Sequence, residues 1–376
     1  MRASTDAVTT LDGFTAQARD WLAANAAHGP RDYGAIVPPE LAEQGIAWQR
    51  RLFAEGWAGI HWPVEHGGQG LAPEHQAAWL EQCALAGVPP FLNMVGLVLA
   101  GGAIQRFGTP EQKDRHLRAT LAAEQVWCQL FSEPGAGSDL GSLSTRAERD
   151  GDRFVVNGQK VWCSGGRYSD WGILMARTDP DLPKHKGISF FLLDMHLPGV
   201  EVRPLRQMTG DAEFDEVFFT DVEVPADCLL GPLNGGWDVG MAVLTSERGH
   251  IGVSVISLGR RLAAMAAMGS GRALAPLERD RLAHLLVRGR AYQAMGRRQG
   301  ATASTAASLM KLGITELMFE AAMLRGDLAG ADGQLEGGEA TGMLAAPGGR
   351  IAGGSSQVQR NIIGERLLGL PREPKG

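Results

Sequence analysis

The sequence predicts an α+β protein of several domains, in which helices at both ends flank a β-rich middle part. Three observations lead to this prediction. Helical periodicity runs from Leu11 to about Ala123, short β-rich segments follow to about Leu230, and long helical patterns return beyond Gly235. A chain of 376 residues also exceeds what one hydrophobic core usually serves. We therefore expect an N-terminal helical domain, a middle β domain and a C-terminal helical domain, at 1–124, 125–232 and 233–376.

The first part has the spacing of amphipathic helices. Within GTPEQKDRHL, Thr109 is a suitable N-cap, Pro110 suits the first helical position and Glu111 places an acidic group in the first turn. A short helix is expected to begin there. Two sets of apolar residues recur at helical spacing and predict helices: Phe14, Ala18, Trp21 and Leu22, and further on Ala77, Leu80, Cys83 and Ala84.

The middle part reads as strands separated by turns. The Asn157-Gly158 pair between Phe154–Val156 and Val161-Trp162 suits the positive φ angles of a hairpin turn. The spacing of the segments predicts a small β-barrel. The expected strands are 154–156, 172–176, 188–193, 200–204 and 217–224.

Helical patterns then return. They run from Val239 to about Met268 and from Ser304 to about Leu324. Between Gly326 and Gly354 the many glycines predict a loop or an interrupted helix.

Composition narrows the class of protein. The formal charge of −6, from 36 basic and 42 acidic residues, is too mild for a nucleic-acid or membrane surface, although local basic residues could meet a phosphate. No apolar run approaches the roughly 20 residues of a membrane helix, and we expect a soluble, cytoplasmic protein without a metal site. The cysteines are expected to be reduced and buried: Cys83, Cys128, Cys163 and Cys228.

Two short blocks in the middle part carry the functional signal. In QLFSEPGAGSD, from Gln129 to Asp139, Pro134 and two glycines interrupt regular structure, while serines and main-chain amides supply hydrogen bonds to a flat or anionic ligand. In NGQKVWCSGG, from Asn157 to Gly166, Trp162 lies at a strand end. Each block alone is ordinarily a turn or a core strand. The occurrence of both blocks together is what indicates a ligand-binding site.

A third block, GGSSQVQRNIIGERLLGLP from Gly353 to Pro371, completes the set. Together the three blocks resemble the acyl-CoA dehydrogenase family, and the resemblance spans essentially the whole chain. It implies the acyl-CoA dehydrogenase fold, with an N-terminal α-helical domain, a middle β-barrel and a C-terminal four-helix bundle. The flavin would lie between barrel and bundle.

The resemblance also implies a reaction, the α,β-dehydrogenation of an acyl-CoA thioester with FAD as cofactor. A carboxylate removes the α-proton while the β-hydrogen passes as hydride to flavin N5. Because the α-proton of a thioester is weakly acidic, donors must stabilise the enolate oxygen and the carboxylate must be desolvated. An electron-transfer flavoprotein is the implied acceptor of the electrons.

The usual position of the base is vacant in this chain. It corresponds to Gly353, whose N–H could still donate to the thioester carbonyl. A minority of the family carries the glutamate on a bundle helix before an arginine, which matches Glu247 and Arg248 in TSERG. On a helix, Glu247 shares a face with Val243, Leu244 and Ile251, so we expect it to be partly desolvated. The alternative is an ordinary solvated or ion-paired helix glutamate.

Cofactor contacts are implied position by position. Gln129 stands where an aromatic residue is common in the family. Ser138 and Gly353 are the implied substrate contacts. The implied cofactor contacts are Leu130, Phe131, Ser132, Gly137, Ser138, Trp162, Ser164, Ser355 and Gln357.

In homotetrameric relatives, two segments of one subunit bind the adenine half of FAD in the neighbouring subunit. The corresponding segments of this chain, residues 268–286 and GADGQLEGGEATGM, match those of the relatives poorly. This predicts a second, unlike acyl-CoA dehydrogenase-like subunit in a heterotetramer, as in the enzymes of actinobacterial steroid side-chain degradation. The vacant pocket at Gly353 suits a bulky acyl group. A homotetramer would remain possible if Arg272 or Arg281 served as phosphate ligand, although each reads as a solvent-facing helix arginine.

Two other functions remain open from the sequence. A flavin monooxygenase or nitrososynthase on the same fold would tolerate the vacant position 353, but it would have less need of Glu247. A non-catalytic structural subunit of a heteromer need not keep the two middle blocks.

Overall fold

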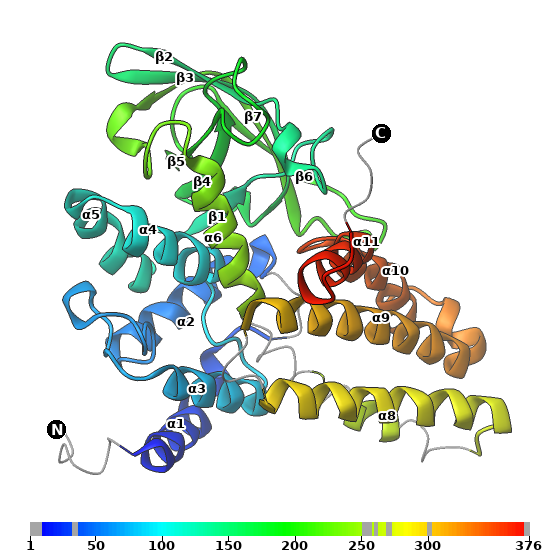
Figure 1. The fold of residues 1–376 in the computed structure, drawn as a ribbon. Helices are drawn as coiled ribbons and strands as arrows, with labels where there is room; N and C mark the ends of the chain where they lie inside the picture. Colours follow the sequence, from blue (N-terminus) through cyan, green and yellow to red (C-terminus); the bar gives the residue numbers. More distant parts are fainter. Residues whose placement is uncertain are drawn as a thin grey trace. The chain divides into compact units, whose positions relative to one another are not determined.

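Helices build the first part of the chain in this computed structural model, which describes residues 10–31, 37–249, 258, 262–267, 273–298 and 303–371, without the side chains of 245–249, 297–298 and 303–306. Thr109 Oγ1 accepts a hydrogen bond from Gln112 N at 3.3 Å, and Gln112 Oε1 accepts one from Thr109 N at 3.1 Å. This capping box confirms the predicted helix start. The helices in Figure 1 are α1 (Leu11–Asn25), α2 (Ala42–Ala54), α3 (Pro73–Ala86), α4 (Gly101–Phe107) and α5 (Pro110–Leu121), with π-helical η4 (Val95–Ala100) before α4.

The core between these helices is aromatic. The predicted helical spacing in this segment is confirmed by α1, in which Phe14, Ala18 and Leu22 are buried and Trp21 is half-buried. The predicted helical spacing of Ala77, Leu80, Cys83 and Ala84 is confirmed by α3, in which Trp79 and Cys83 are the buried residues. Trp79 stacks on Trp57, with ring centroids 4.8 Å apart and planes at 12°, so burial of two indole rings sets the rotation of α3.

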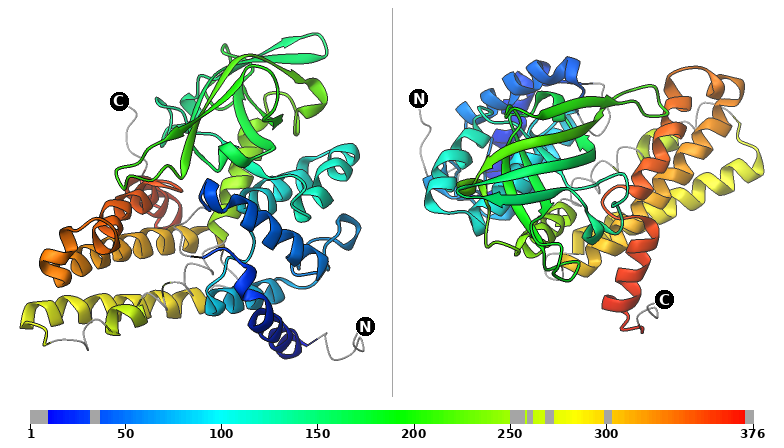
Figure 2. Two further views of the ribbon diagram at one scale, coloured as in Figure 1. Left: turned by 180° about the vertical axis from the view of Figure 1, so that it is seen from behind. Right: turned by 90° about the horizontal axis from the view of Figure 1, so that it is seen from above.

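The middle part is a curled seven-stranded sheet, seen from above on the right of Figure 2. The strand order is β1-β4-β2-β3-β7-β6, and β5 pairs with β4. β1 and β4 are parallel, whereas β3 and β7 form the long antiparallel pair. Five strands were expected, and β1 and β2 were missed. The strands are β1 (Trp127–Leu130), β2 (Arg146–Asp150), β3 (Arg153–Ser164), β4 (Trp171–Arg177), β5 (Ile188–Asp194), β6 (Val200–Leu205) and β7 (Phe214–Pro225).

The Asn157-Gly158 pair does not form the predicted hairpin turn. Both residues lie inside β3, where the register with β7 shifts between Val156 and Gly158. The Asn157 side chain bonds both the main-chain N and the carboxylate of Asp221 across the strands. A Cβ on Gly158 would lie 2.5 Å from Thr145 Oγ1. The pair therefore forms a β-bulge at which β2 approaches closely.

α6 (Gly236–Gly249) follows the sheet and packs against it. A Cβ on Gly240 would lie 2.7 Å from the Met175 sulfur of β4, so the glycine allows the close contact. The four cysteines are buried and free, as predicted.

The chain divides into two compact units, Met1–Ser246 and Glu247–Gly376. In the second unit α8 and α9 lie side by side in both Figure 1 and Figure 2. The predicted helix from Ser304 is confirmed, and the glycine-rich stretch is an interrupted helix. The elements are α8 (Pro276–Arg298), α9 (Ala303–Ala329), η8 (Gly330–Gln334), α10 (Gly338–Ile351), α11 (Ser356–Ile362) and the π-helical turn η9 (Ile363–Leu367).

The core of the second unit has helical periodicity. From α9 it takes Met310, Ile314, Leu317, Ala321 and Leu324, which pack with Leu282 and Leu285 of α8 and with Leu258, Leu262 and Met265. The predicted helix from Val239 to Met268 is helical up to Gly249, at Leu258 and over 262–267, and its other residues lie outside the described part. Among the helices that are described, none has the length and apolar character to cross a bilayer.

Candidate active site

The first block leaves β1 and turns sharply. Leu130 and Phe131 are 0% and 4% exposed, and the Phe131 ring packs edge-on against Phe190 at 5.7 Å. Their side chains belong to the core, so only their main chain can meet a ligand. The carbonyl of Ser132 accepts a hydrogen bond from Val161 N at 2.9 Å. That bond joins the first block to the second.

The glycines of the first block line open space. Glu133 and Ala136 exchange two main-chain hydrogen bonds of 3.0 Å and close a tight turn. A Cβ at Gly135 or Gly137 would have no neighbour within 4 Å, and Ser138 is exposed. The turn therefore presents bare main chain and a hydroxyl to whatever binds beside it.

Trp162 is the most unusual residue of the second block. It lies where β3 and β7 lose register between Lys160 and Cys163, and its φ is +62°. A left-handed residue other than glycine costs roughly 1–2 kcal/mol. The result is an indole that is 56% exposed and lies edge-on to Phe214. Strain that turns a large aromatic ring outward, one residue after the hydrogen bond from Val161 N to the first block, favours a stacking surface for a flat ligand.

Ser164 and the turn after it are held from β7. Ser164 is half-buried and pairs in register with Phe214. Asp215 is buried and accepts hydrogen bonds from Arg167 N at 3.0 Å and from Arg167 Nε at 2.7 Å. Burial raises the pKa of Asp215, and the Arg167 guanidinium opposes that rise. The end of β3 is thus fixed in place.

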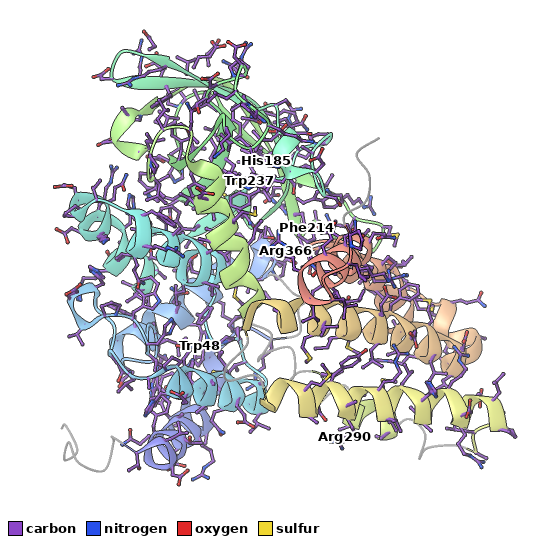
Figure 3. All side chains as sticks on the ribbon, in the orientation of Figure 1. Trp48, His185, Phe214, Trp237, Arg290 and Arg366 are labelled. Carbon is purple, nitrogen blue, oxygen red and sulfur yellow. The ribbon has the colours of Figure 1, made fainter. Side chains whose placement is uncertain are left out.

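A basic pocket lies beyond the first block, with a volume of about 540 Å³. Arg177 donates to the carbonyls of Gly141 and Lys184 at 2.8 Å, and so ties the loop after β4 to the segment that follows the first block. The same loop is packed by His185 on Trp237 of α6, with ring centroids 4.3 Å apart (Figure 3). The lining residues are Leu143, Ser144, Arg146, Glu148, Arg177, Thr178, Pro180, Leu182 and Lys184.

The third block lies in the second unit and begins in the turn between α10 and α11. Gly353 and Gly354 have φ angles of +64° and +94°, so the main chain turns left-handed at two successive residues. Ser355 caps α11 by accepting from Val358 N at 3.3 Å, and Gln357 is exposed. Gly353, Ser355 and Gln357 are therefore grouped within this unit.

Two charged residues of α9 hold this turn. Lys311 Nζ donates to the Gly354 carbonyl at 2.7 Å. Glu316 Oε1 accepts from Ser356 Oγ at 2.6 Å and from Arg350 Nε at 3.2 Å. Burial raises the pKa of Glu316, but the hydrogen bond from Ser356 and the arginine charges outweigh it and lower the pKa overall. The turn at Gly353 is thus anchored from a neighbouring helix.

Glu247 and Arg248 occupy the last turn of α6, and their side chains lie outside the described part. On the same helix Val243 is buried and Leu244 is half-buried. Ile251 and Arg272 also lie outside the described residues. Arg281, the other proposed phosphate ligand, forms a 2.8 Å ion pair with Asp327 at the surface.

Glu133 and Lys160 were not predicted as site residues, yet they form an ion pair inside the sheet, with Lys160 Nζ 2.7 Å from Glu133 Oε1. The signal was the strand alternation: Lys160 is in phase with the buried Phe154 and Val156, and a lysine at an inward position requires a partner. Among the residues the structure describes, no group of His, Cys, Asp and Glu could hold a metal ion.

Comparison with known proteins gives matches along the whole chain. Three family models cover it in order: acyl-CoA dehydrogenase, N-terminal domain, over residues 12–124, middle domain over 128–222, and C-terminal domain over 234–368. The acyl-CoA dehydrogenase IpdE1 of Mycobacterium tuberculosis is 39% identical, with 97% of this chain and 99% of the relative covered. The acyl-CoA dehydrogenase FadE29 of the same organism is 33% identical, with 93% and 91% covered.

Two solved structures are similar over nearly the whole chain. The ChsE4-ChsE5 complex from Mycobacterium tuberculosis has a TM-score of 0.81 at 28% identity, with 99% of this chain and 100% of that chain covered. The Tcur3481-Tcur3483 steroid ACAD has a TM-score of 0.82 at 28% identity, with 96% and 98% covered. The predicted succession of helical, β and helical parts is confirmed, whereas the boundaries at 124 and 232 stay predictions.

Proposed function

Because the chain belongs to the acyl-CoA dehydrogenase family, we propose that it dehydrogenates an acyl-CoA thioester between Cα and Cβ, with Glu247 as the base. Acyl-CoA dehydrogenases are oxidoreductases that use flavin, so the enzyme class follows from the family. The cofactor, the base and the substrate proposed here go beyond what family membership establishes. Their main support is the ligand-facing surface formed by the first two blocks in the first unit.

That surface fits FAD. The exposed Trp162 ring offers a stacking face, and the open positions at Gly135 and Gly137 allow a flat ring system to approach the main chain. When bound, FAD supplies the hydride acceptor. We propose that it is held by the main chain of Leu130, Phe131 and Gly137, by the hydroxyls of Ser132, Ser138 and Ser164, and by Ser355 and Gln357 of the third block.

The protein's own residues are proposed to bind the substrate and to transfer its α-proton. Glu247 is proposed to take the α-proton, and the buried Val243 one turn earlier supports a partly desolvated position on α6. Arg248 is proposed to keep that carboxylate ionised between turnovers. The N–H of Gly353 is proposed to donate to the thioester carbonyl and stabilise the enolate oxygen. Ser138 is proposed as a further substrate contact.

The basic pocket supports a phosphorylated substrate. Arg146 and Lys184 line it from β2 and from the loop after β4, and Arg177 lies at its wall. Arg146 is also 3.6 Å from Glu148, and Lys184 is paired with Asp139, so a phosphate would compete with these carboxylates. Phosphate groups bind where guanidinium and ammonium groups converge. We propose that the pocket takes a phosphate-bearing part of CoA.

A bulky, steroid-type acyl group is proposed on the strength of the relatives. One solved neighbour is named a steroid ACAD, and two neighbours are two-component complexes. We propose that this chain also assembles with a second acyl-CoA dehydrogenase-like subunit and passes electrons to an electron-transfer flavoprotein. Exposed apolar residues after α11, Leu368 at 65% and Leu370 at 55%, with Ile351 at 68%, support a surface that a partner covers.

Two measurements on the purified chain test the proposal. The first is the flavin content per chain, alone and after co-expression with a homologous second subunit. Little flavin alone and full loading in the complex is the expected result, whereas full loading of the isolated chain overturns the heteromer. The second is anaerobic bleaching of the bound flavin by a CoA thioester with a steroid side chain. Absence of bleaching with this and with straight-chain thioesters overturns the dehydrogenase.

A further inference from the structure

The ion pair between Lys160 and Glu133 is the most deeply buried charged contact in the described first unit. The side chains are 0% and 5% exposed, and the nitrogen and oxygen are 2.7 Å apart. Taking two charges out of water costs several kcal/mol for each ion, so such a pair is weak evidence for stability alone. Its place in the sheet therefore needs another explanation.

The pair joins the segments that carry the proposed flavin contacts. Lys160 immediately precedes Val161 and Trp162 on β3. Its ammonium also donates to the carbonyl of Phe131 at 3.0 Å. The ammonium thus links the second block to the main chain of the first block one residue before Ser132.

Glu133 fixes the other side of the same turn. One carboxylate oxygen accepts from Ser144 N at 2.7 Å and Ser144 Oγ at 2.8 Å, and the other accepts from Thr145 N at 2.9 Å. Burial alone raises the pKa of Glu133, but Lys160 and these donors lower it to about 2. Burial lowers the pKa of Lys160, and the carboxylate opposes that shift. The carboxylate is held by the start of β2 whether or not lysine is present.

We infer that Lys160 and Glu133 are positioning residues, which hold the main chain at Phe131 and Ser132 in register with the Trp162 bulge so that the two blocks form one flavin-binding surface. This inference rests on the proposed FAD site. Neither residue is assigned a contact with cofactor or substrate. The pair acts through the main chain on each side of it, together with the 2.9 Å bond from Val161 N to the Ser132 carbonyl.

A cycle of Lys160→Met, Glu133→Gln and the double variant separates positioning from stability. Removing one partner leaves a buried charge without its counterion, so each single variant is expected to lower the melting temperature. The double variant removes both charges, and its melting temperature is expected to recover most of that loss. The tie to the Phe131 carbonyl stays broken in Lys160→Met and in the double variant.

The readout is FAD affinity and the quenching of flavin fluorescence in the full chain, with its second subunit if flavin retention requires one. Loss of a charge-assisted hydrogen bond is expected to weaken FAD binding about tenfold or more in Lys160→Met and in the double variant. Quenching by Trp162 is expected to decrease in both. Val222→Ala, a buried change elsewhere on β7, is the control and should lower the melting temperature with unchanged FAD affinity.

The outcomes are distinct. Weak FAD binding that persists in the stable double variant supports positioning. FAD affinity that recovers together with stability, or that follows stability in Val222→Ala as well, overturns this inference and leaves the proposed function intact. If the wild-type protein binds no FAD, alone or with its partner, the proposed function falls and this inference falls with it.

Discussion

Trp162 lies edge-on to Phe214, with ring centroids 5.8 Å apart and ring planes at 81°. The contact occurs where β3 and β7 lose register, and it supports an indole that is otherwise 56% exposed. A strained residue with an exposed ring contributes little to folding. We therefore expect its ligand-binding and folding roles to separate on mutation.

Trp162→Gly should leave the stability of the flavin-free protein unchanged or raise it by up to about 1 kcal/mol, because glycine adopts positive φ without strain. FAD binding should weaken by about tenfold through loss of ring stacking. Thermal unfolding without flavin and FAD titration measure the two effects. Ala123→Gly is the control, since Ala123 also has positive φ, at +52°, and lies outside the blocks; it should leave FAD affinity unchanged. Equal FAD affinity in wild type and Trp162→Gly contradicts the stacking role.

A glutamate at position 353 should not replace Glu247. Gly353 has a φ of +64°, so Gly353→Glu is expected to cost roughly 1–2 kcal/mol in the free energy of unfolding. In the Glu247→Ala background it should restore no turnover. Thermal melting and steady-state turnover check both parts.

Gly349→Glu is the matched control for that substitution. Gly349 is exposed within α10, and a Cβ there has no neighbour within 4 Å. Helix propensity therefore predicts a gain of a few tenths to about 1 kcal/mol. Restored turnover in the double variant that combines Glu247→Ala with Gly353→Glu would refute the prediction that a glutamate at position 353 cannot replace Glu247.

Acid stability should depend on Glu133. Its pKa falls from the ordinary 4.5 to about 2 in the folded protein, so its contribution is complete above pH 4.5 and is lost as the pH falls toward 2. This lowering of the pKa on folding corresponds to about 3 kcal/mol in the free energy of unfolding. Urea unfolding between pH 6 and pH 3 should show a weaker decline of the free energy of unfolding in Glu133→Gln than in wild type. Parallel declines contradict the charged state assigned to this carboxylate.

The basic pocket should discriminate between thioesters. Arg146→Ala is expected to raise KM for an acyl-CoA by a few-fold to about tenfold with little change in kcat. KM for the corresponding acyl-pantetheine, which lacks the nucleotide, should stay the same. Arg149→Ala on the same strand is the control, because Arg149 does not line the pocket. A KM effect of equal size on both thioesters excludes phosphate recognition here.

Local chemistry made some features predictable from the sequence. The start of α5 followed from Thr109 and Pro110, because capping depends on neighbouring residues alone. The Asn157-Gly158 pair was misread because its conformation depends on Asp221 and Thr145, which are remote in sequence. The helical spacing that predicted α3 was local as well, whereas the stacking of its Trp79 on Trp57 joins residues that are 22 positions apart.

In the candidate site, too, the features set by local sequence were predicted and those set by long-range pairing were not. Trp162 and the glycines of the first block were identified by their motifs, but the left-handed bulge that exposes the indole arises from pairing with β7. The role of Lys160 could be recognised only together with its partner, Glu133, which lies 27 residues earlier in the chain. Long-range pairing decides such contacts, and sequence periodicity indicates only that Lys160 points inward.

The most direct test of the central claim is anaerobic mixing of the flavin-loaded protein with an acyl-CoA thioester, in wild type and in Glu247→Gln. Glu336→Gln, an exposed change after η8, serves as the control. Wild type and control should bleach the flavin, while Glu247→Gln should retain FAD but bleach about 10²–10⁴ times more slowly, as expected for loss of a general base. Bleaching of Glu247→Gln at the wild-type rate would contradict the assignment of the base.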